Sequence, residues 1–443
     1  MGLLVAKFGG SSAADGIQIR KIRSIVESDP NRRYIVVSAP GKRFDGDNKV
    51  TDLLYLLASH ADHNAPYEQL FQVIKERFLG MESDLGVAVG IANEFIIIEK
   101  ALKTGAASAD YLASRGEYLS AKLIAAFLGF DFVDTAGLVL FSGKGKFLYE
   151  DTNAALAKEL AKHERAVLPG FYGSVPDGSV KTFSRGGSDI TGALAARAAG
   201  AAVYENWTDV SGFLMADPRI IPEAKAISHI SYKELRELSY MGASVLHENA
   251  IYPARLAGIP INIRNTNAPE DSGTFISADD TPAEGSVITG IAGNRDFTVI
   301  GIYKNMMSNE IGFIKRILSI LEDYSVPIEH IPSGIDTVSL VIANKFLEGK
   351  LGDLIEDFEK KLGADSIELF EDMSLIATVG CRMASHRGVA AKLFGALCKA
   401  GVNIRMIDQG SSEMNIIVGV ETKDFEVAIR AIYDTFIGGQ SGE

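Results

Sequence analysis

The sequence is poor in cysteine, in basic charge and in long apolar runs. Its 2 cysteines among 443 residues are too few for a disulfide framework or a cysteine-rich metal site. Aspartate and glutamate (57) outnumber lysine and arginine (44), and the net charge of −13 disfavours binding to a nucleic-acid backbone. No uncharged apolar run could span a bilayer, and the first residues lack a signal peptide. These absences predict a cytoplasmic protein that binds neither nucleic acid nor membrane.

Up to about residue 290, short apolar segments alternate with amphipathic ones. Residues 3–8 and 34–39 read as buried strands, and residues 189–199 read as a helix that ends at Gly200. A polar loop over residues 40–49 leads to a helix near Thr51. This alternation is typical of an α/β fold, a three-layer αβα sandwich whose mostly parallel sheet binds ligands at the carboxyl ends of its strands.

After residue 290 the sequence repeats itself at an offset of 76 residues. Gly312 matches Gly388 and Val326 matches Val402 without a gap, and each copy reads as a strand, a helix, a strand, a turn and a strand. This pattern predicts two ferredoxin-like βαββαβ modules, residues 291–370 and 371–443, after a catalytic domain of residues 1–290. The alternative is chance similarity between two amphipathic helices that are each followed by strands.

A first glycine motif, Lys7-Phe8-Gly9-Gly10-Ser11-Ser12, follows the first predicted strand. Glycines let backbone N–H groups approach an anion, the helix behind them adds its positive end, and Lys7 adds a full charge. These features fit the phosphates of a nucleotide, although a tight turn with a surface lysine would look similar. No Gly-Lys pair in the chain is followed by Ser or Thr, which excludes a Walker A loop.

A second glycine motif, Ser184-Arg185-Gly186-Gly187-Ser188-Asp189, also lies between a predicted strand and a helix. Arg185 offers a planar fork for a carboxylate, and the glycines with the helix start form a second anion cradle. Asp189 alone could be a helix cap. A third segment, with Thr208, Asp209 and Arg219, could hold ribose, base or phosphate, or could be a hydrogen-bonded loop.

Together these motifs resemble the aspartokinases of the amino acid kinase family. The resemblance covers essentially the whole chain and also rests on residues 114–117, 170–173, 208–210 and 217–219, and the 76-residue repeat resembles paired ACT modules. It implies that the chain uses ATP to phosphorylate the β-carboxylate of L-aspartate at the start of lysine, threonine and methionine biosynthesis. Mg²⁺ would be bound mainly through the nucleotide phosphates.

The resemblance also implies a role for each site residue. Lys7 would contact the phosphoryl group in transfer, Asp189 would orient Lys7, and Arg185 and Glu117 would bind the α-carboxylate and α-ammonium of aspartate. The remaining substrate residues would be Thr51, Phe171, Gly186 and Ser188, and the remaining ATP residues Gly9, Gly10, Ser11, Thr208, Asp209 and Arg219. Because the acceptor carboxylate is already ionised at pH 7, Asp189 is predicted to organise the site and not to accept a proton.

ACT modules imply regulation by an amino acid, here lysine, threonine or both, and either a homodimer formed through the modules or a tetramer. The implied effector residues are Met307, Gly312, Phe313, Glu329 and Ser333. No further domain follows residue 443, so we expect a monofunctional chain.

Two positions depart from the family pattern. Ser244 stands where many relatives carry a lysine that can approach ATP, and Leu214 stands where some have an aromatic residue near the adenine. Both bear on ATP affinity. The competing hypotheses are an amino acid kinase with another acceptor, such as glutamate, and a non-catalytic amino-acid sensor. The motif Arg115-Gly116-Glu117 and the two modules argue against the first, and the presence of Lys7, Arg185 and Asp189 argues against the second.

Overall fold

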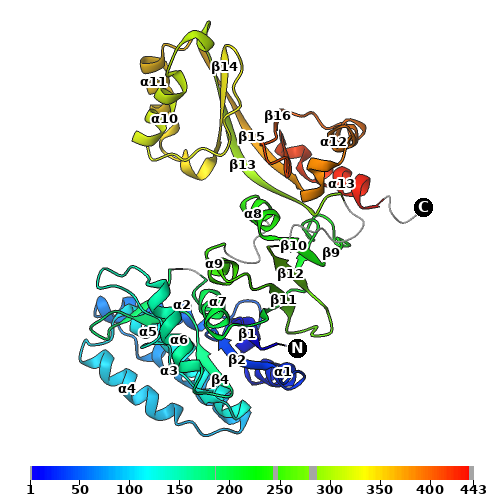
Figure 1. Ribbon diagram of the computed structural model, residues 1–443. Helices are drawn as coiled ribbons and strands as arrows, with labels where there is room; N and C mark the ends of the chain where they lie inside the picture. The colour runs from blue at the N-terminus through cyan, green and yellow to red at the C-terminus, as the bar shows by residue number, and fades with distance from the viewer. Residues whose placement is uncertain (1, 185, 243–247, 279–286, 439–443) are drawn as a thin grey trace. The chain divides into compact units, whose positions relative to one another are not determined.

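The computed structural model describes residues 2–184, 186–242, 248–278 and 287–438, so Arg185 and Ser244 lie outside the described residues. The chain forms two compact units (Figure 1). The first unit comprises Met1–Phe213, Ala226–Tyr232 and Val245–Thr281, and the second comprises Leu214–Lys225, Lys233–Ser244 and Pro282–Glu443. The domain boundaries expected at residues 290 and 370 stay predictions.

The first unit is built on an eight-stranded sheet. In spatial order its strands are β10 (His229–Ser231), β12 (Thr274–Ser277), β11 (Ile261–Asn265), β7 (Val203–Thr208), β1 (Leu4–Phe8), β2 (Arg32–Val37), β4 (Ala166–Pro169) and β3 (Asp131–Phe132). Every pairing in this order is parallel except that of β11 with β12. A small hairpin of β5 (Tyr172–Ser174) and β6 (Val180–Thr182) lies outside this sheet. The mostly parallel sheet is therefore confirmed.

Helices cover both faces of this sheet, which confirms the predicted three layers. On β1, Ala6 and Phe8 belong to an apolar core shared with α1 (Gly16–Glu27), α2 (Val50–Asp62), α3 (Glu68–Leu85), α4 (Ile91–Lys103) and α5 (Ala109–Leu128). Because side chains alternate along a strand, Val5 and Lys7 face the other layer. That layer contains α6 (Tyr149–Leu160), α7 (Gly187–Ala199) and α9 (Glu248–Leu256).

The ends of several helices follow from local chemistry. The carboxylate of Asp15 accepts a hydrogen bond from the backbone N–H of Gln18 and caps α1, and Gly200 ends α7 in the left-handed conformation, as predicted. No helix in the described ranges is long and apolar enough to cross a membrane. The short strands β8 (Phe213–Leu214) and β9 (Ala226–Ile227) lie where the chain passes between the two units.

The second unit contains a five-stranded antiparallel sheet and five α-helices among its described residues. The strand order is β14 (Thr337–Ala343), β13 (Gly290–Tyr303), β15 (Ser366–Val379), β17 (Asn415–Glu421) and β16 (Met406–Asp408). The helices are α8 (Tyr232–Tyr240), α10 (Phe313–Asp323), α11 (Leu351–Leu362), α12 (Val389–Lys399) and α13 (Phe425–Phe436).

The 76-residue repeat is visible in this sheet, but the two copies share strands and differ in detail. The start of β13, residues 290–294, pairs with residues 375–379 of β15, so it completes the sheet of the second copy. The second copy has strand β16, whereas the equivalent stretch of the first forms only isolated bridges at His330 and Ser333. Pro327 and Pro332 interrupt that stretch, because proline has no N–H to donate to a sheet.

Candidate active site

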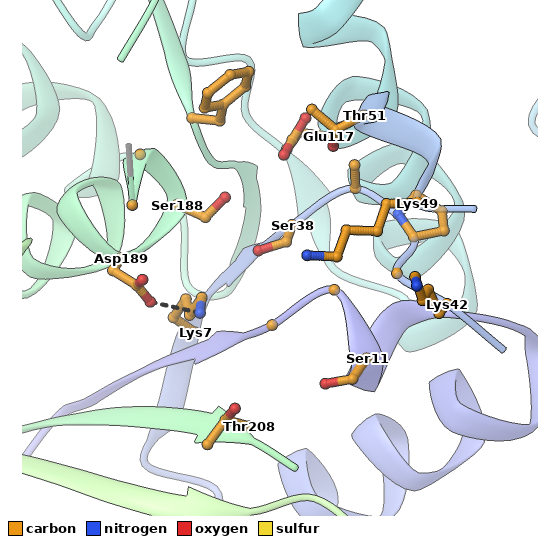
Figure 2. Close-up of a pocket in the computed structure, with 18 of the residues that line it drawn as sticks. Lys7, Ser11, Ser38, Lys42, Lys49, Thr51, Glu117, Ser188, Asp189 and Thr208 are labelled. Carbon is orange, nitrogen blue, oxygen red and sulfur yellow. Dashed lines mark ion pairs between the residues drawn. The ribbon is translucent and has the colours of Figure 1, made fainter. Parts of the chain in front are cut away.

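A cavity of about 1030 Å³ opens at the carboxyl ends of β1, β2 and β7 in the first unit (Figure 2). Its wall includes Lys7 on β1, Ser38 just after β2, Thr208 at the end of β7 and the first turns of α2 and α7. This is the edge at which parallel α/β sheets bind their ligands. The volume is sufficient for a nucleotide together with a small acid.

Lys7 is a nearly buried cation held by two partners. Its Nζ lies 2.5 Å from Oδ1 of Asp189 and 3.4 Å from Oδ1 of Asn206. Nδ2 of Asn206 donates to Oδ1 of Asp189 at 2.9 Å, so the three side chains close a ring of contacts. Lys7 and Asn206 are neighbours because β1 and β7 pair at this register. The sequence pattern did not single out Asn206 as a site residue.

The first glycine turn lies against other backbone on both sides. The N–H of Gly9 donates to the carbonyl of Trp207 at 2.9 Å, and the N–H of Gly41 donates to the carbonyl of Gly10 at 2.7 Å. A Cβ on Gly10 would lie 3.0 Å from the carbonyl oxygen of Ala39, so a side chain there would press on this contact. The close approach of the Ala39 carbonyl therefore explains why glycine occupies position 10.

One expectation for this turn is wrong. A three-residue 3₁₀ turn, Ser11–Ala13, follows the glycines, and α1 begins only at Gly16. Asp15 caps α1 by accepting from the N–H of Gln18, so the start of α1 lies beyond this cap and does not directly follow the glycines. Residues 11–15 separate the glycines from α1, so the chain does not pass directly from strand to α-helix here.

The second glycine turn leads directly into a helix. Gly186 has a left-handed conformation (φ 60°) and immediately precedes α7, which begins at Gly187. A Cβ on Gly187 would lie 2.7 Å from the ring and 2.8 Å from the Cα of Phe171. Phe171 itself has φ 77° and donates its N–H to Oγ1 of Thr191 at 3.2 Å. This turn and residue 171 are therefore packed tightly around the start of α7.

Glu117 brings a buried carboxyl group from α5 into the cavity, where Thr51 from α2 also lines the wall (Figure 2). Burial raises the pKa of Glu117 to about 8, although a hydrogen bond from the backbone of Ala39 acts in the opposite direction. Its Oε2 is buried without a hydrogen-bond partner among the described residues. Such an acid is prepared to receive a cationic group.

Arg115, in the same segment of α5, is not part of the described cavity wall. Its guanidinium lies over the rings of Tyr111, Tyr118 and Tyr172, with distances of 4.3–5.7 Å to the ring centroids. It also donates to Oγ of Ser114 at 2.9 Å. These contacts pack its side chain against aromatic residues of α5 and β5.

Most of the predicted catalytic, substrate and ATP residues line this one cavity. Those present are Lys7, Gly9, Gly10, Ser11, Thr51, Glu117, Phe171, Gly186, Ser188, Asp189, Thr208 and Asp209. Arg185 lies outside the described residues. Arg219 belongs to the second unit, where it is exposed and pairs with Asp217 at 2.6 Å.

The predicted effector residues do not share one described cavity. Met307 and Phe313 are buried, and Gly312 precedes α10, whereas Ser333 is exposed. Glu329 instead lines a cavity of about 700 Å³ and accepts a hydrogen bond from the hydroxyl of Tyr240. Burial, followed by this contact, raises the pKa of Tyr240 to about 12.

In the second repeat, four equivalent positions do come together. Met383, Gly388, Val389 and Gln409 lie 76 residues after Met307, Gly312, Phe313 and Ser333. All four line a cavity of about 350 Å³ at the start of α12.

Comparisons with known proteins agree along the whole chain. The sequence profile of the amino acid kinase family matches residues 2–265, and the profile of an ACT domain matches residues 376–436. Aspartokinase 3 of Bacillus subtilis is 37% identical over 449 residues, which cover 98% of this chain and 99% of that protein.

Solved structures agree as well. The crystal structure of Clostridium acetobutylicum aspartate kinase superposes with a TM-score of 0.92 at 51% identity and covers 98% of this chain and 100% of that one. E. coli aspartokinase III is 26% identical, covering 98% and 99%. It superposes with TM-scores of 0.73 for its complex with aspartate and ADP and 0.75 for its complex with lysine and aspartate.

Proposed function

Because the chain belongs to the amino acid kinase family and, within it, to the aspartokinases, which phosphorylate the side-chain carboxyl group of aspartate, we propose how its cavity performs this reaction. ATP lies along the first glycine turn and Thr208, and aspartate lies between Glu117 and the start of α7. The observation that carries this arrangement is the position of Lys7, which is held by Asp189 where the two sides of the cavity meet.

The chemistry requires charge stabilisation and no general base. An oxygen of the aspartate β-carboxylate attacks the γ-phosphorus, the new P–O bond forms, and the bond to the ADP oxygen breaks. Both groups are anions, so the main obstacle is their repulsion and the charge on the phosphoryl group in transit. Lys7 supplies a fixed positive charge there. Asp189 and Asn206 keep its amine in place, which agrees with an organising role for Asp189.

On the acceptor side, Glu117 binds the α-ammonium group of aspartate. Its carboxyl group is buried in the described wall, and its Oε2 has no hydrogen-bond partner among the described residues, so it can accept from an ammonium group. Ser188 and Thr51 offer hydroxyl groups to the reacting carboxylate, and Phe171 forms part of the wall. The resemblance alone assigns the α-carboxylate to Arg185. The complex of E. coli aspartokinase III with aspartate and ADP supports both ligands.

Magnesium fits this site as an ion carried by the nucleotide. Mg²⁺ keeps phosphate and water ligands and takes only one or two carboxylates from a protein. Asp209 lines the cavity beside Thr208 and forms no ion pair within the described residues. No cluster of three or more metal-binding side chains occurs in the part of the chain that the structure describes. Bound Mg²⁺ would offset part of the triphosphate charge.

For regulation, we propose that lysine, threonine or both bind at the ACT modules and that the modules join two chains in a homodimer, either alone or paired again as a tetramer. The complex of E. coli aspartokinase III with lysine supports an amino-acid effector. An effector acts only if it binds the active and inactive states with different affinities. A cytoplasmic location and a contact of Arg219 with ATP stay predictions.

The decisive experiment measures ADP release by purified protein with MgATP and aspartate, and then with glutamate as the alternative acceptor. We expect turnover with aspartate only, suppressed by added lysine or threonine. Turnover with glutamate, or binding of an amino acid without any ATP turnover, would contradict the proposed reaction. Light scattering of the same sample reports whether the effector changes the number of chains.

A further inference from the structure

We propose that Lys49 is an additional catalytic residue, whose amine contacts the phosphoryl group during transfer. It lies at the end of a loop, residues 40–49, that the structure anchors beside the first glycine turn. This inference rests on the positions proposed above for ATP and aspartate.

The charges in the cavity show why a further cation is needed. Lys7, Lys42 and Lys49 are the lysines in its described wall. The charge of Lys7 is already compensated by Asp189 at 2.5 Å. The amines of Lys42 and Lys49 form no ion pair or hydrogen bond with any described residue. Among the described residues of the wall, these two lysines therefore carry the positive charge that no acid compensates.

The base of the loop is closed by backbone hydrogen bonds. The N–H of Val50 donates to the carbonyl of Pro40 at 3.0 Å, which joins the two ends of the loop. The N–H of Gly41 donates to Gly10 at 2.7 Å, which fixes the same end to the first glycine turn. Lys49 immediately precedes α2, and its own carbonyl accepts from Leu53 at 3.1 Å. Its backbone is thus held at both sides.

Arg77 of α3 anchors the loop from behind. Its buried guanidinium donates to the carbonyl of Asn48 at 2.9 Å and to that of Gly41, one near each end of the loop. Asp47 lies 3.5 Å from the same guanidinium and accepts from Arg43. The hydrogen bond from Arg43 holds the pKa of the Asp47 carboxyl well below its usual range. These contacts hold the loop in a defined position beside the cavity.

The direction of Lys49 assigns its role. Figure 2 shows its side chain pointing into the cavity, between Glu117 and Thr51 on one side and Lys7 and Ser11 on the other. In the proposed arrangement the first pair borders aspartate and the second borders ATP. A cation in this position reduces the repulsion between the two anions and stabilises the phosphoryl group as it passes between them.

The test compares four variants: Lys49→Met, Lys49→Arg, Lys42→Met and, as a control, Lys158→Met. Lys158 is an exposed lysine on α6 that does not line the cavity. Each variant is assayed for kcat with aspartate, and for calorimetric binding of MgADP and of the magnesium complex of a non-hydrolysable ATP analogue. Only the analogue carries the terminal phosphate that Lys49 would contact.

Lys49→Met should lower kcat about 30-fold, somewhat less than the loss of a fully preorganised donor. It should weaken analogue binding about tenfold and MgADP binding less than about twofold, and Lys49→Arg should recover most of the analogue affinity. Lys158→Met should match the wild type.

Three results would overturn the assignment. The first is a kcat of Lys49→Met within about threefold of wild type, and the second is equal weakening of MgADP and analogue binding in that variant. The third is an equal defect in Lys42→Met, which would mean that any positive charge in the cavity has the same effect. Analogue binding needs no aspartate turnover. The wild type could prove inactive on aspartate while Lys49→Met still selectively weakens binding of the analogue. That combination would refute the proposed reaction and leave Lys49 as a phosphate ligand.

Discussion

The two glycine turns that border the cavity look alike in sequence but are built in different ways. After Gly9 and Gly10 the chain makes a 3₁₀ turn, and the next helix is capped by Asp15. After Gly186 the chain enters α7 at once, so the unpaired N–H groups and positive end of α7 lie at the cavity. The first turn must therefore obtain its positive charge from side chains, whereas the second has it from its backbone.

The difference shows how the site is held together. The cation of the first turn, Lys7, is fixed by an acid from the second, Asp189, and Asn206 on β7 contacts both. A change at either turn should consequently affect a different ligand, whereas a change in the link between them should affect the transfer itself.

The largest effect is expected for Lys7→Ala, which removes the cation of the first turn. Turnover should fall by about 100-fold or more, because one preorganised electrostatic contact to the transferred group is lost. The measurement is kcat with MgATP and aspartate under saturating conditions. The thermal unfolding midpoint serves as the control for folding, and near-normal turnover in a folded variant would remove Lys7 from the mechanism.

A smaller effect is expected for Gly187→Ala in the second turn. The new Cβ would lie within 2.8 Å of the backbone of Phe171, so Phe171 or α7 must shift. Overpacking of this kind costs about 1–3 kcal/mol, and we expect the KM for aspartate to rise about 20-fold while the KM for MgATP changes little.

The matched variant is Gly10→Ala in the first turn, whose Cβ would press on the carbonyl of Ala39. It should raise the KM for MgATP and leave the KM for aspartate nearly unchanged. If both variants raised the same KM, the assignment of one turn to each ligand would be wrong.

Glu117 should make aspartate binding depend on pH. Because burial raises its pKa to about 8, it is mostly protonated at pH 7, and it must lose that proton to pair with an ammonium group. The KM for aspartate should therefore fall as pH rises, by up to about tenfold per pH unit between pH 6 and 8. In Glu117→Gln the KM should be high and flat, and the wild type should approach it at pH 6.

The same shift has an opposite consequence for stability. The folded state keeps a proton that the unfolded chain releases above its ordinary pKa of 4.5. The free energy of unfolding should therefore decrease as pH rises from about 4.5 to about 8, and Glu117→Gln should lack this decrease. A wild type and variant with parallel profiles in denaturant titrations would show that Glu117 is not a buried acid.

Much of this fold could be predicted because buried strands and capped helices leave local signals. The apolar runs predicted β1 to within one residue and β2 to within two, and Gly200 correctly marked the end of α7. The start of α1 could not be predicted, because the polar residues before Gly16 allow several caps and only packing selects Asp15. In the repeat, the periodicity was correct but could not show that β13 is shared between the two copies.

Within the site, residues in glycine motifs could be predicted, whereas those that depend on strand register could not. Asn206 is an amide within a strand, and nothing local distinguishes it from a structural residue. It becomes part of the site only because β7 pairs with β1 so that Asn206 lies beside Lys7. Lys49 could not be singled out either, because it is one of several charged residues in its loop. The loop is anchored by Arg77, which lies on a later helix, and such a long-range contact leaves no local signal.

The smallest effect is expected for Asn206→Ala, which loosens the link between the turns without removing a charge. The lost hydrogen bonds are worth about 1 kcal/mol, so kcat should fall about fivefold. A double-mutant cycle with Asp189→Asn tests the link itself, because groups that act on one cation should be coupled and their effects on kcat should not add. Additive effects would mean that Asn206 only packs against β1. In that case Lys7 would depend on Asp189 alone, and the first turn would be tied to the second by a single ion pair.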